Sequence, residues 1–330
     1  MNPPARIAVI GGGAWGTALA QVAASGGDQV LLWAREPEVV ADINAVHENR
    51  TFLPGISLGR GVIATADLAE MSACEAVLVV TPAQHLRSTL ARLPQVAVPL
   101  ILCAKGIEEA TAKLMHEVAA EEQPGAPIAV LSGPTFAHEV AIGLPAAVTL
   151  AVADRRIGER LVARLARPAF RPYLSDDVAG AEMGGAVKNV LAIACGVVDG
   201  LGLGQNARAA LISRGFAEMT RFGLARGARA ETLAGLSGLG DLVLTCSSVS
   251  SRNFSLGKGL GEGRPAAALL ADRHTVAEGA FTAPVLRRAA EQAGVDMPIV
   301  SAVCDLLDGN ASASDVAERL LSRPLRPEAA

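Results

Sequence analysis

Short apolar segments alternate with helical segments over the first half of the chain. Segments with helical spacing of apolar residues lie at 14–24, 38–46, 111–120 and 155–165. The segments between them that resemble strands are 6–10, 29–33, 61–65, 76–80, 100–103, 128–131, 146–152 and 170–173. Strands that alternate with helices in this way favour a parallel, doubly wound sheet.

The pattern changes near residue 176. Strand-like segments stop, and the remaining helical segments are expected at 177–199, 206–225, 265–271, 280–293 and 299–307. A chain of 330 residues is also long for one hydrophobic core. We therefore predict an α/β Rossmann-type domain over residues 1–180, followed by an all-α domain over residues 181–330.

Composition and charge restrict the partners and the compartment. The hydrophobic fraction of 51% is too high for a disordered protein, and a net charge of −4 gives no general attraction to nucleic acid. The N-terminus has no secretory apolar region, and the apolar segment 190–204 is too short and too interrupted for a membrane span. Five scattered cysteines without a CxxC pair favour reduced thiols in the cytoplasm, and the five histidines lack the spacing of metal ligands, so no metal is expected.

A glycine motif follows the first predicted strand. Gly11, Gly13 and Gly16 form G-x-G-x-x-G, and they stand between a strand and an apolar helix, as a dinucleotide-binding unit requires. Gly11 permits the tight turn, Gly13 lets a pyrophosphate approach the backbone, and Gly16 lets the helix pack on the strand. The helix N-terminus would then stabilise the phosphates. The motif predicts a nicotinamide dinucleotide cofactor.

The end of the second strand bears on the choice between NAD and NADP. Arg35 and Glu36 both lie about 20 residues past the glycines, where an acidic residue would bind the ribose 2′-hydroxyl of NAD. Pro37 suits the first turn of the next helix, which places Glu36 at the helix start and leaves Arg35 at the strand tip. Arg35 would then meet a 2′-phosphate, although a solvated surface arginine is the alternative. NADP is the preferred cofactor and NAD remains open.

Two loops follow the carboxyl ends of predicted strands, the edge at which doubly wound sheets bind ligands. Lys105 stands in the first loop and would meet a phosphate or carbonyl oxygen unless it is a solvent-exposed loop lysine. The second loop contains Gly133 and Thr135, whose N–H groups and hydroxyl would hold substrate. Capping of the next helix explains Thr135 nearly as well.

Lys188 lies in an almost wholly apolar helical segment, after Gly184 and Gly185, which allow a close neighbour. Burial disfavours the charged form of an amine, so we expect a lowered pKa that suits a general base. A lysine that reaches the surface is the alternative.

Two polar segments after Lys188 are further candidates for substrate contacts. Asp241 comes after flexible glycines and would either orient Lys188 or the substrate hydroxyl, or only cap a helix. Ser251, Arg252 and Asn253 precede a predicted helix and suit a phosphate site, because a guanidinium and helix N–H groups both favour phosphate. A simple capped loop is the alternative.

Taken together, these motifs resemble the bacterial NAD(P)-dependent glycerol-3-phosphate dehydrogenases. The matching stretches, in order from residue 11 to residue 253, are GGGAWGTALA, CAKGIE, LSGPTFA, GGAVKNV, GLGDLVLTC and SSRN. The resemblance implies that Lys188 is the proton acceptor. It implies substrate contacts at Lys105, Gly133, Thr135, Lys188, Asp241, Ser251, Arg252 and Asn253. It implies cofactor contacts at Gly11, Gly13, Ala14, Trp15, Gly16, Arg35, Lys105, Ala137, Arg252, Val276 and Glu278.

The resemblance also implies a reaction: hydride transfer between NAD(P)H and dihydroxyacetone phosphate, giving sn-glycerol 3-phosphate for phospholipid synthesis. A homodimer would fit the family. Ala14 and His138 depart from the usual Ser and Lys, and neither position touches the expected chemistry. Two other functions stay open: a reductase for a hydroxy acid or ketopantoate-like substrate, and a non-catalytic sensor of NADP(H).

Overall fold

The computed structural model describes residues 7–271 and 277–322. Contacts between residues divide the chain into two compact units. The first, here called the sheet unit, comprises Met1–Gly185 and Gly227–Asp241. The second, the helical unit, comprises Ala186–Arg226 and Leu242–Ala330. The chain therefore passes from one unit to the other three times.

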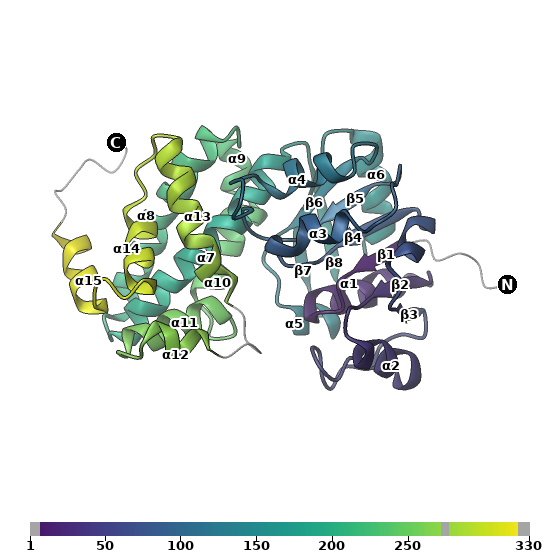
Figure 1. Ribbon diagram of the computed structural model, residues 1–330, viewed down its shortest axis with the longest axis horizontal. Helices are drawn as coiled ribbons and strands as arrows, with labels where there is room; N and C mark the ends of the chain where they lie inside the picture. The colour runs from purple at the N-terminus through teal and green to yellow at the C-terminus, as the bar shows by residue number, and fades with distance from the viewer. Residues whose placement is uncertain (1–6, 272–276, 323–330) are drawn as a thin grey trace. The chain divides into compact units, whose positions relative to one another are not determined.

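The sheet unit contains one eight-stranded sheet (Figure 1). Its strands are β1 (Ile7–Ile10), β2 (Val30–Trp33), β3 (Val62–Thr65), β4 (Ala76–Val79), β5 (Leu100–Leu102), β6 (Ile128–Ser132), β7 (Ala146–Val152) and β8 (Phe170–Ser175). Their order is β3-β2-β1-β4-β5-β6-β7-β8. The first six strands are parallel, as predicted, whereas β7 runs antiparallel to β6. The order reverses direction between β1 and β4, which is the switch point where such sheets bind ligands.

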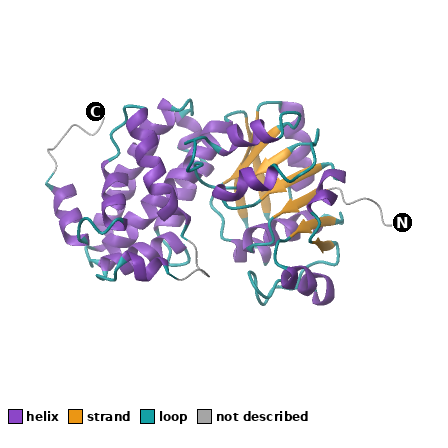
Figure 2. Cartoon of the chain, viewed as in Figure 1, coloured by secondary structure: helices purple, strands orange, loops and turns teal. Residues whose placement is uncertain are grey.

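Helices cover both faces of this sheet (Figure 2). One face packs against α1 (Ala14–Ala24), α2 (Pro37–Val46), α5 (Ala137–Ala141) and α6 (Arg155–Leu165). The other face packs against α3 (Leu86–Leu90) and α4 (Met115–Glu122), with two short 3-10 turns at Leu68–Ala73 and Ala83–His85. Because successive strand residues point to opposite faces, strands buried on both faces are apolar throughout.

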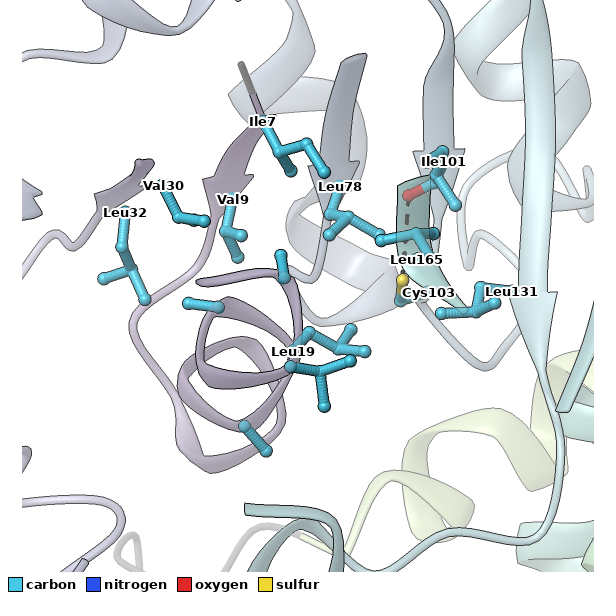
Figure 3. Close-up of a cluster of buried hydrophobic side chains, with 14 of the residues drawn as sticks. Ile7, Val9, Leu19, Val30, Leu32, Leu78, Ile101, Cys103, Leu131 and Leu165 are labelled. Atoms are coloured by element: carbon cyan, nitrogen blue, oxygen red, sulfur yellow. Dashed lines mark hydrogen bonds between the residues drawn. The ribbon is translucent and has the colours of Figure 1, made fainter. Parts of the chain in front are cut away.

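The core on the α1 face is built almost entirely from aliphatic side chains. Figure 3 shows Val9 and Leu78 from neighbouring strands facing Leu19 of α1. Cys103 lies in the same cluster, and its thiol donates a long hydrogen bond of 3.7 Å to the Ile101 carbonyl. Three glycines, Gly11–Gly13, separate the end of β1 from the start of α1, so the helix begins directly beyond the strand.

The remaining elements are helical, and the described residues after Ser175 contain no strand. The helices are α7 (Val178–Gly200), α8 (Gly204–Ala225), α9 (Ala230–Leu233), α10 (Asp241–Cys246), α11 (Arg252–Gly261), α12 (Ala266–Leu270), α13 (Glu278–Gln292), α14 (Pro298–Leu307) and α15 (Ala313–Leu321). A π-helical turn, Leu236–Gly240, precedes α10. The predicted fold class, a Rossmann-type sheet followed by helices, is confirmed.

Helix α7 is the one described helix whose length and composition would allow it to cross a membrane. In its most apolar window, 94% of the residues are buried inside the protein, which is the behaviour of a core helix. Glycines bring α11 against it: a Cβ on Gly196 would lie 2.0 Å from the Phe254 carbonyl oxygen, and one on Gly257 1.9 Å from that of Ile193. This close packing fixes α11 beside the second half of α7, which follows Lys188.

Candidate functional site

The glycine loop has the geometry that the fingerprint requires. Gly11 has φ of +123°, a conformation that residues with a Cβ rarely adopt, and a Cβ there would lie 2.8 Å from the Val80 carbonyl oxygen. A Cβ on Gly16 would lie 1.9 Å from the Gly11 carbonyl oxygen, so only glycine fits. A Cβ on Gly13 would meet nothing within 4 Å, which means that the backbone there borders open space.

The start of α1 fits a pyrophosphate. Gly13 is the N-cap residue, its backbone is extended, no side chain caps the helix, and the first turn contains no acidic residue. The N–H groups of Ala14, Trp15 and Gly16, which begin the helix, are therefore left to an external anion, which the helix dipole also favours. Ala14 and Trp15 are partly buried against the core, which fixes the helix start.

Arg35 follows β2 beside this loop. A Cβ on Gly12 would lie 2.5 Å from that of Ala34, so the residue before Arg35 touches the glycines. The Arg35 side chain is 74% exposed, and its Nε and Nη2 donate hydrogen bonds of 3.1 and 2.9 Å to Glu36 Oε1. Pro37 begins α2 and Glu36 is its N-cap residue, as predicted, but the Glu36 carboxylate holds Arg35 instead of capping the helix.

Lys105 and Asp241 form an ion pair within the sheet unit, although 136 residues separate them in sequence. Lys105 Nζ lies 2.7 Å from Asp241 Oδ2, and the Asp241 side chain is fully buried. Neither of the two simpler alternatives, a solvent lysine or a plain helix-capping aspartate, describes this pair. A buried carboxylate holds the amine of Lys105 at the loop that follows β5.

Lys188 is buried in the helical unit, with a residue exposure of 5%. Its amine donates a hydrogen bond of 2.9 Å to the hydroxyl of Thr245 on α10, which is also 5% exposed. The alternative of a lysine reaching the surface is therefore wrong. Sequence reasoning missed Thr245, although it lies within the motif GLGDLVLTC and is a polar residue in an apolar segment.

The two glycines before Lys188 permit close contacts, as expected. A Cβ on Gly184 would lie 2.1 Å from the Ser237 carbonyl oxygen. A Cβ on Gly185 would lie 3.2 Å from Lys105 Cγ and 3.5 Å from Ser132 Oγ. The beginning of α7 therefore packs directly on the loops that follow β5 and β6.

The loop after β6 contains Gly133, Thr135 and Ala137. A Cβ on Gly133 would lie 2.8 Å from the Val148 Cα, so contact with β7 requires glycine here. The Thr135 hydroxyl donates a 3.3 Å hydrogen bond to the Gly133 carbonyl and does not cap α5, whose N-cap residue is Phe136. Capping therefore does not explain Thr135. Ala137 is the first residue of α5 and lies partly buried against the core.

The predicted phosphate residues lie at the start of α11. Ser251 is the N-cap residue, and its hydroxyl accepts a 3.3 Å hydrogen bond from the Phe254 N–H. Arg252 is exposed at the first helical position. Asn253 is 8% exposed, and its Oδ1 accepts a 2.9 Å hydrogen bond from the Gly279 N–H. Ser251 therefore caps α11, as the alternative of a simple capped loop had it, and Asn253 makes a contact with α13 that sequence reasoning did not anticipate.

Glu278, next to Gly279, begins α13. The hydrogen bond between Asn253 and Gly279 therefore joins the start of α11 to the start of α13, where Glu278, a predicted cofactor contact, lies. Val276, the other predicted contact in this stretch, lies outside the described residues.

Two buried hydroxyls at the carboxyl ends of the parallel strands have no hydrogen-bond partner among the described residues. Thr81 Oγ1 lies just past the end of β4, and Ser132 Oγ lies at the end of β6. Buried polar groups are normally paired, so these atoms leave hydrogen-bonding capacity for a ligand at this edge. Sequence reasoning assigned a role to neither residue, although Ser132 lies within the motif LSGPTFA.

The family models match nearly the whole chain. Residues 6–157 match the N-terminal domain of NAD-dependent glycerol-3-phosphate dehydrogenase, and residues 177–318 match its C-terminal domain. A curated glycerol-3-phosphate dehydrogenase (NAD(P)+) from Erythrobacter litoralis is 67% identical over 324 residues, 98% of each chain. One from Sphingopyxis alaskensis is 61% identical over 320 residues, 97% of each chain.

Solved structures agree with the sequence comparisons. The glycerol-3-phosphate dehydrogenase of Coxiella burnetii has a TM-score of 0.92 at 38% identity, covering 96% of this chain and 99% of that one. A ketopantoate reductase of Ralstonia eutropha, at 15% identity over 94% of this chain and 99% of that one and a TM-score of 0.61, shares the fold alone. The resemblance seen in the motifs and the expectation of NAD or NADP as cofactor are therefore confirmed. The chain belongs to the NAD-dependent glycerol-3-phosphate dehydrogenase family.

Proposed function

We propose that this chain interconverts dihydroxyacetone phosphate and sn-glycerol 3-phosphate with NAD(P)H. The observation that carries the chemistry is the buried amine of Lys188, hydrogen-bonded to Thr245. The close identity to glycerol-3-phosphate dehydrogenases over the whole chain supports the choice of substrate. A sensor that only binds nucleotide would have no use for a buried lysine amine, whose desolvation is costly.

In this proposal the glycine loop of the sheet unit binds the pyrophosphate of the cofactor. The N–H groups at the start of α1 bind the pyrophosphate, with Gly11, Gly13, Ala14, Trp15 and Gly16 shaping the loop. Further cofactor contacts come from Lys105 and Ala137 in the sheet unit, and from Arg252, Val276 and Glu278 in the helical unit.

NADP is the preferred cofactor, because the exposed Arg35 guanidinium can pair with a 2′-phosphate. NADH is used as well, because Glu36 already engages Arg35 and offers a carboxylate near the ribose.

The substrate is held by its phosphate and by its oxygens. Arg252, at the exposed first position of α11, binds the phosphate together with Ser251 and Asn253. Gly133, Thr135 and the Lys105–Asp241 pair contact the rest of the substrate. Because the phosphate lies away from the reacting carbon, its binding energy serves to position that carbon.

Lys188 moves the proton. When bound, the reduced nicotinamide supplies the hydride that reaches the substrate C2. The Lys188 ammonium then gives its proton to the oxygen on C2 during reduction, and the neutral amine takes it back during oxidation. Thr245 holds the amine through its hydroxyl, which limits the directions in which Nζ can point.

The setting of the reaction follows from the same assignment. We place the protein in the cytoplasm, where its product would supply phospholipid synthesis, and we propose a homodimer. The boundary near residue 180, with a dinucleotide-binding domain at 1–180 and a substrate-binding domain at 181–330, stays a prediction. Light scattering on the purified chain tests the dimer directly.

Initial rates with dihydroxyacetone phosphate and with ketopantoate test the proposed function. Purified protein should oxidise NADPH, and more slowly NADH, when dihydroxyacetone phosphate is added, and inorganic phosphate should inhibit competitively with that substrate. Ketopantoate should give no turnover. Turnover with ketopantoate but not with the phosphorylated ketone would overturn the assignment, and so would nucleotide binding without turnover of either ketone.

A further inference from the structure

A buried asparagine outside the predicted site is hydrogen-bonded to the glycine loop. Asn49 lies three residues past α2 and is fully buried. Its Nδ2 lies 2.8 Å from the Gly12 carbonyl oxygen and 2.8 Å from Thr17 Oγ1. Its Oδ1 accepts a 3.0 Å hydrogen bond from the Phe52 N–H. The Asn49 amide nitrogen therefore donates to the glycine loop and to α1, and the amide oxygen accepts from the turn that follows Asn49.

The hydroxyl of Thr17 completes this arrangement. Thr17 is fully buried in the second turn of α1. Its Oγ1 accepts a hydrogen bond from Asn49 and donates one of 3.4 Å to the Gly12 carbonyl oxygen. The Gly12 carbonyl thus receives two side-chain donors in a fully buried position, where hydrogen bonds are costly to leave unmade.

These bonds fix the direction of one peptide group. The peptide that joins Gly12 to Gly13 is planar and trans, so its carbonyl and its N–H point in opposite directions. Because Asn49 and Thr17 hold the carbonyl, the N–H of Gly13 points away from them. Open space borders Gly13, where a Cβ would meet nothing within 4 Å. Consecutive glycines would otherwise leave this peptide free to rotate.

We propose that Asn49 and Thr17 are positioning residues that orient the Gly12–Gly13 peptide before the cofactor arrives, so that its N–H serves the pyrophosphate. A loop that is ordered in advance does not lose its conformational entropy on binding, which increases affinity. The inference rests on the proposed function in one respect, that the glycine loop binds a dinucleotide. Because Asn49 and Thr17 contact the glycine loop and not the reacting atoms, substitutions at either residue should change the affinity for the cofactor and not the rate of hydride transfer.

Two substitutions at Thr17 separate the hydroxyl from the shape of the side chain. Thr17→Val removes the hydroxyl and keeps the branched shape, whereas Thr17→Ser keeps the hydroxyl. We expect Thr17→Val to raise KM for NADPH and NADH about five- to tenfold, the loss of one to two hydrogen bonds. Its kcat at saturating cofactor should stay within about twofold of wild type. Thr17→Ser should restore most of the affinity.

Asn49→Ala tests the other side chain, and Asn44→Ala is its control variant. Asn44, on α2, also makes two hydrogen bonds through its side-chain amide, from Nδ2 to the Ala64 carbonyl and from the Ala64 N–H to Oδ1, each 2.9 Å. Asn44 touches β3 and not the glycine loop. Both variants should lose stability in urea, but only Asn49→Ala should lose cofactor affinity, by about tenfold or more.

ADP-ribose is the probe that isolates the pyrophosphate, since it lacks the nicotinamide. Its inhibition constant against NADH should rise in Thr17→Val by the same factor as KM for NADH, while KM for dihydroxyacetone phosphate stays unchanged. If Asn49→Ala does not fold, the comparison of Thr17→Val with Thr17→Ser tests the proposal by itself. An ADP-ribose constant unchanged in Thr17→Val, or equally weakened in Asn44→Ala, would overturn the proposal.

Binding of ADP-ribose, measured directly by calorimetry, distinguishes a failure of this inference from a failure of the proposed function. If wild-type protein binds ADP-ribose but reduces no dihydroxyacetone phosphate, the proposed reaction fails and the Thr17 comparison still tests the loop. If wild type is active and Thr17→Val binds ADP-ribose as tightly, the inference fails and the reaction stands.

Discussion

The Lys188 amine and the Thr245 hydroxyl are both buried and lie 2.9 Å apart, so each limits the positions open to the other. Lys105 and Asp241 also restrict each other: their charged groups lie 2.7 Å apart, and the Asp241 side chain is fully buried whereas that of Lys105 is 17% exposed. Arg35 differs, because its side chain is 74% exposed and, among the described residues, pairs with its sequence neighbour Glu36 alone. These two largely buried pairs therefore restrict the positions of their charged or polar atoms, whereas the exposed Arg35–Glu36 pair is free to exchange partners with a ligand.

Thr245→Val tests the first pair. Removing the hydroxyl leaves the Lys188 amine less well oriented, so we expect kcat for ketone reduction to fall about five- to tenfold. KM for NADPH should not change, and Thr245→Ser should recover most of kcat. Steady-state kinetics at saturating cofactor measure this. A kcat equal to that of wild type in Thr245→Val would exclude an orienting role.

Arg35→Ala tests the choice of cofactor. Charge-assisted bonds to a 2′-phosphate are available only to NADPH, so the ratio of kcat/KM for NADPH to that for NADH should fall about tenfold. Arg155→Ala is the matched control, since Arg155 is also exposed and also pairs through Nε with a glutamate, Glu159, at 2.9 Å. An unchanged ratio in Arg35→Ala would show that the 2′-phosphate binds elsewhere.

At the scale of elements, Glu218 shows how one buried carboxylate joins two helices. It lies on α8, is 2% exposed, and its oxygens accept hydrogen bonds of 2.8 and 3.4 Å from the N–H groups of Ile299 and Val300. These are N–H groups of the first turn of α14, whose N-cap residue, Met297, provides no side-chain cap. Desolvation by burial raises the pKa of Glu218 from about 4.5 to about 7, although these hydrogen bonds act in the opposite direction.

This raised pKa predicts a pH dependence of stability. The folded chain binds the Glu218 proton more tightly than the unfolded chain does, so the free energy of unfolding falls as pH rises from about 4.5 to about 7. Glu218→Gln cannot ionise and should remove this slope, making the variant more stable than wild type by about 1–3 kcal/mol at pH 8. Urea unfolding at two pH values measures the difference. A variant less stable than wild type at both would mean that the carboxylate bonds outweigh its desolvation.

Most elements could be predicted from local pattern because each buries one apolar face. Helices α1 and α6 begin and end where the spacing of apolar residues indicates. The direction of β7 was not predictable, because alternation along a strand is the same whichever way it runs. Helix α15 was missed, although Ser312 and Asp315 form a capping box at its start. The glycine-rich stretch before Asp241 was predicted as flexible and is a π-helical turn.

At the scale of the whole molecule, the chain order explains which parts of the site the sequence could reveal. The glycine motif is local, so its residues were identified from spacing alone. The Lys105–Asp241 and Lys188–Thr245 pairs join residues 136 and 57 positions apart, and nothing in a local pattern records such contacts. Asp241 belongs to the sheet unit only because the chain returns to it over Gly227–Asp241.

The turnover of Lys188→Ala tests the central claim most directly. Removing the proton donor should lower kcat for reduction of dihydroxyacetone phosphate by about 100-fold or more, while the dissociation constant for NADPH stays near that of wild type. Lys258→Ala removes another lysine from the helical unit, one whose amine contacts Asp199 on α7, and should leave kcat within about twofold. Near-wild-type turnover in Lys188→Ala would contradict the account.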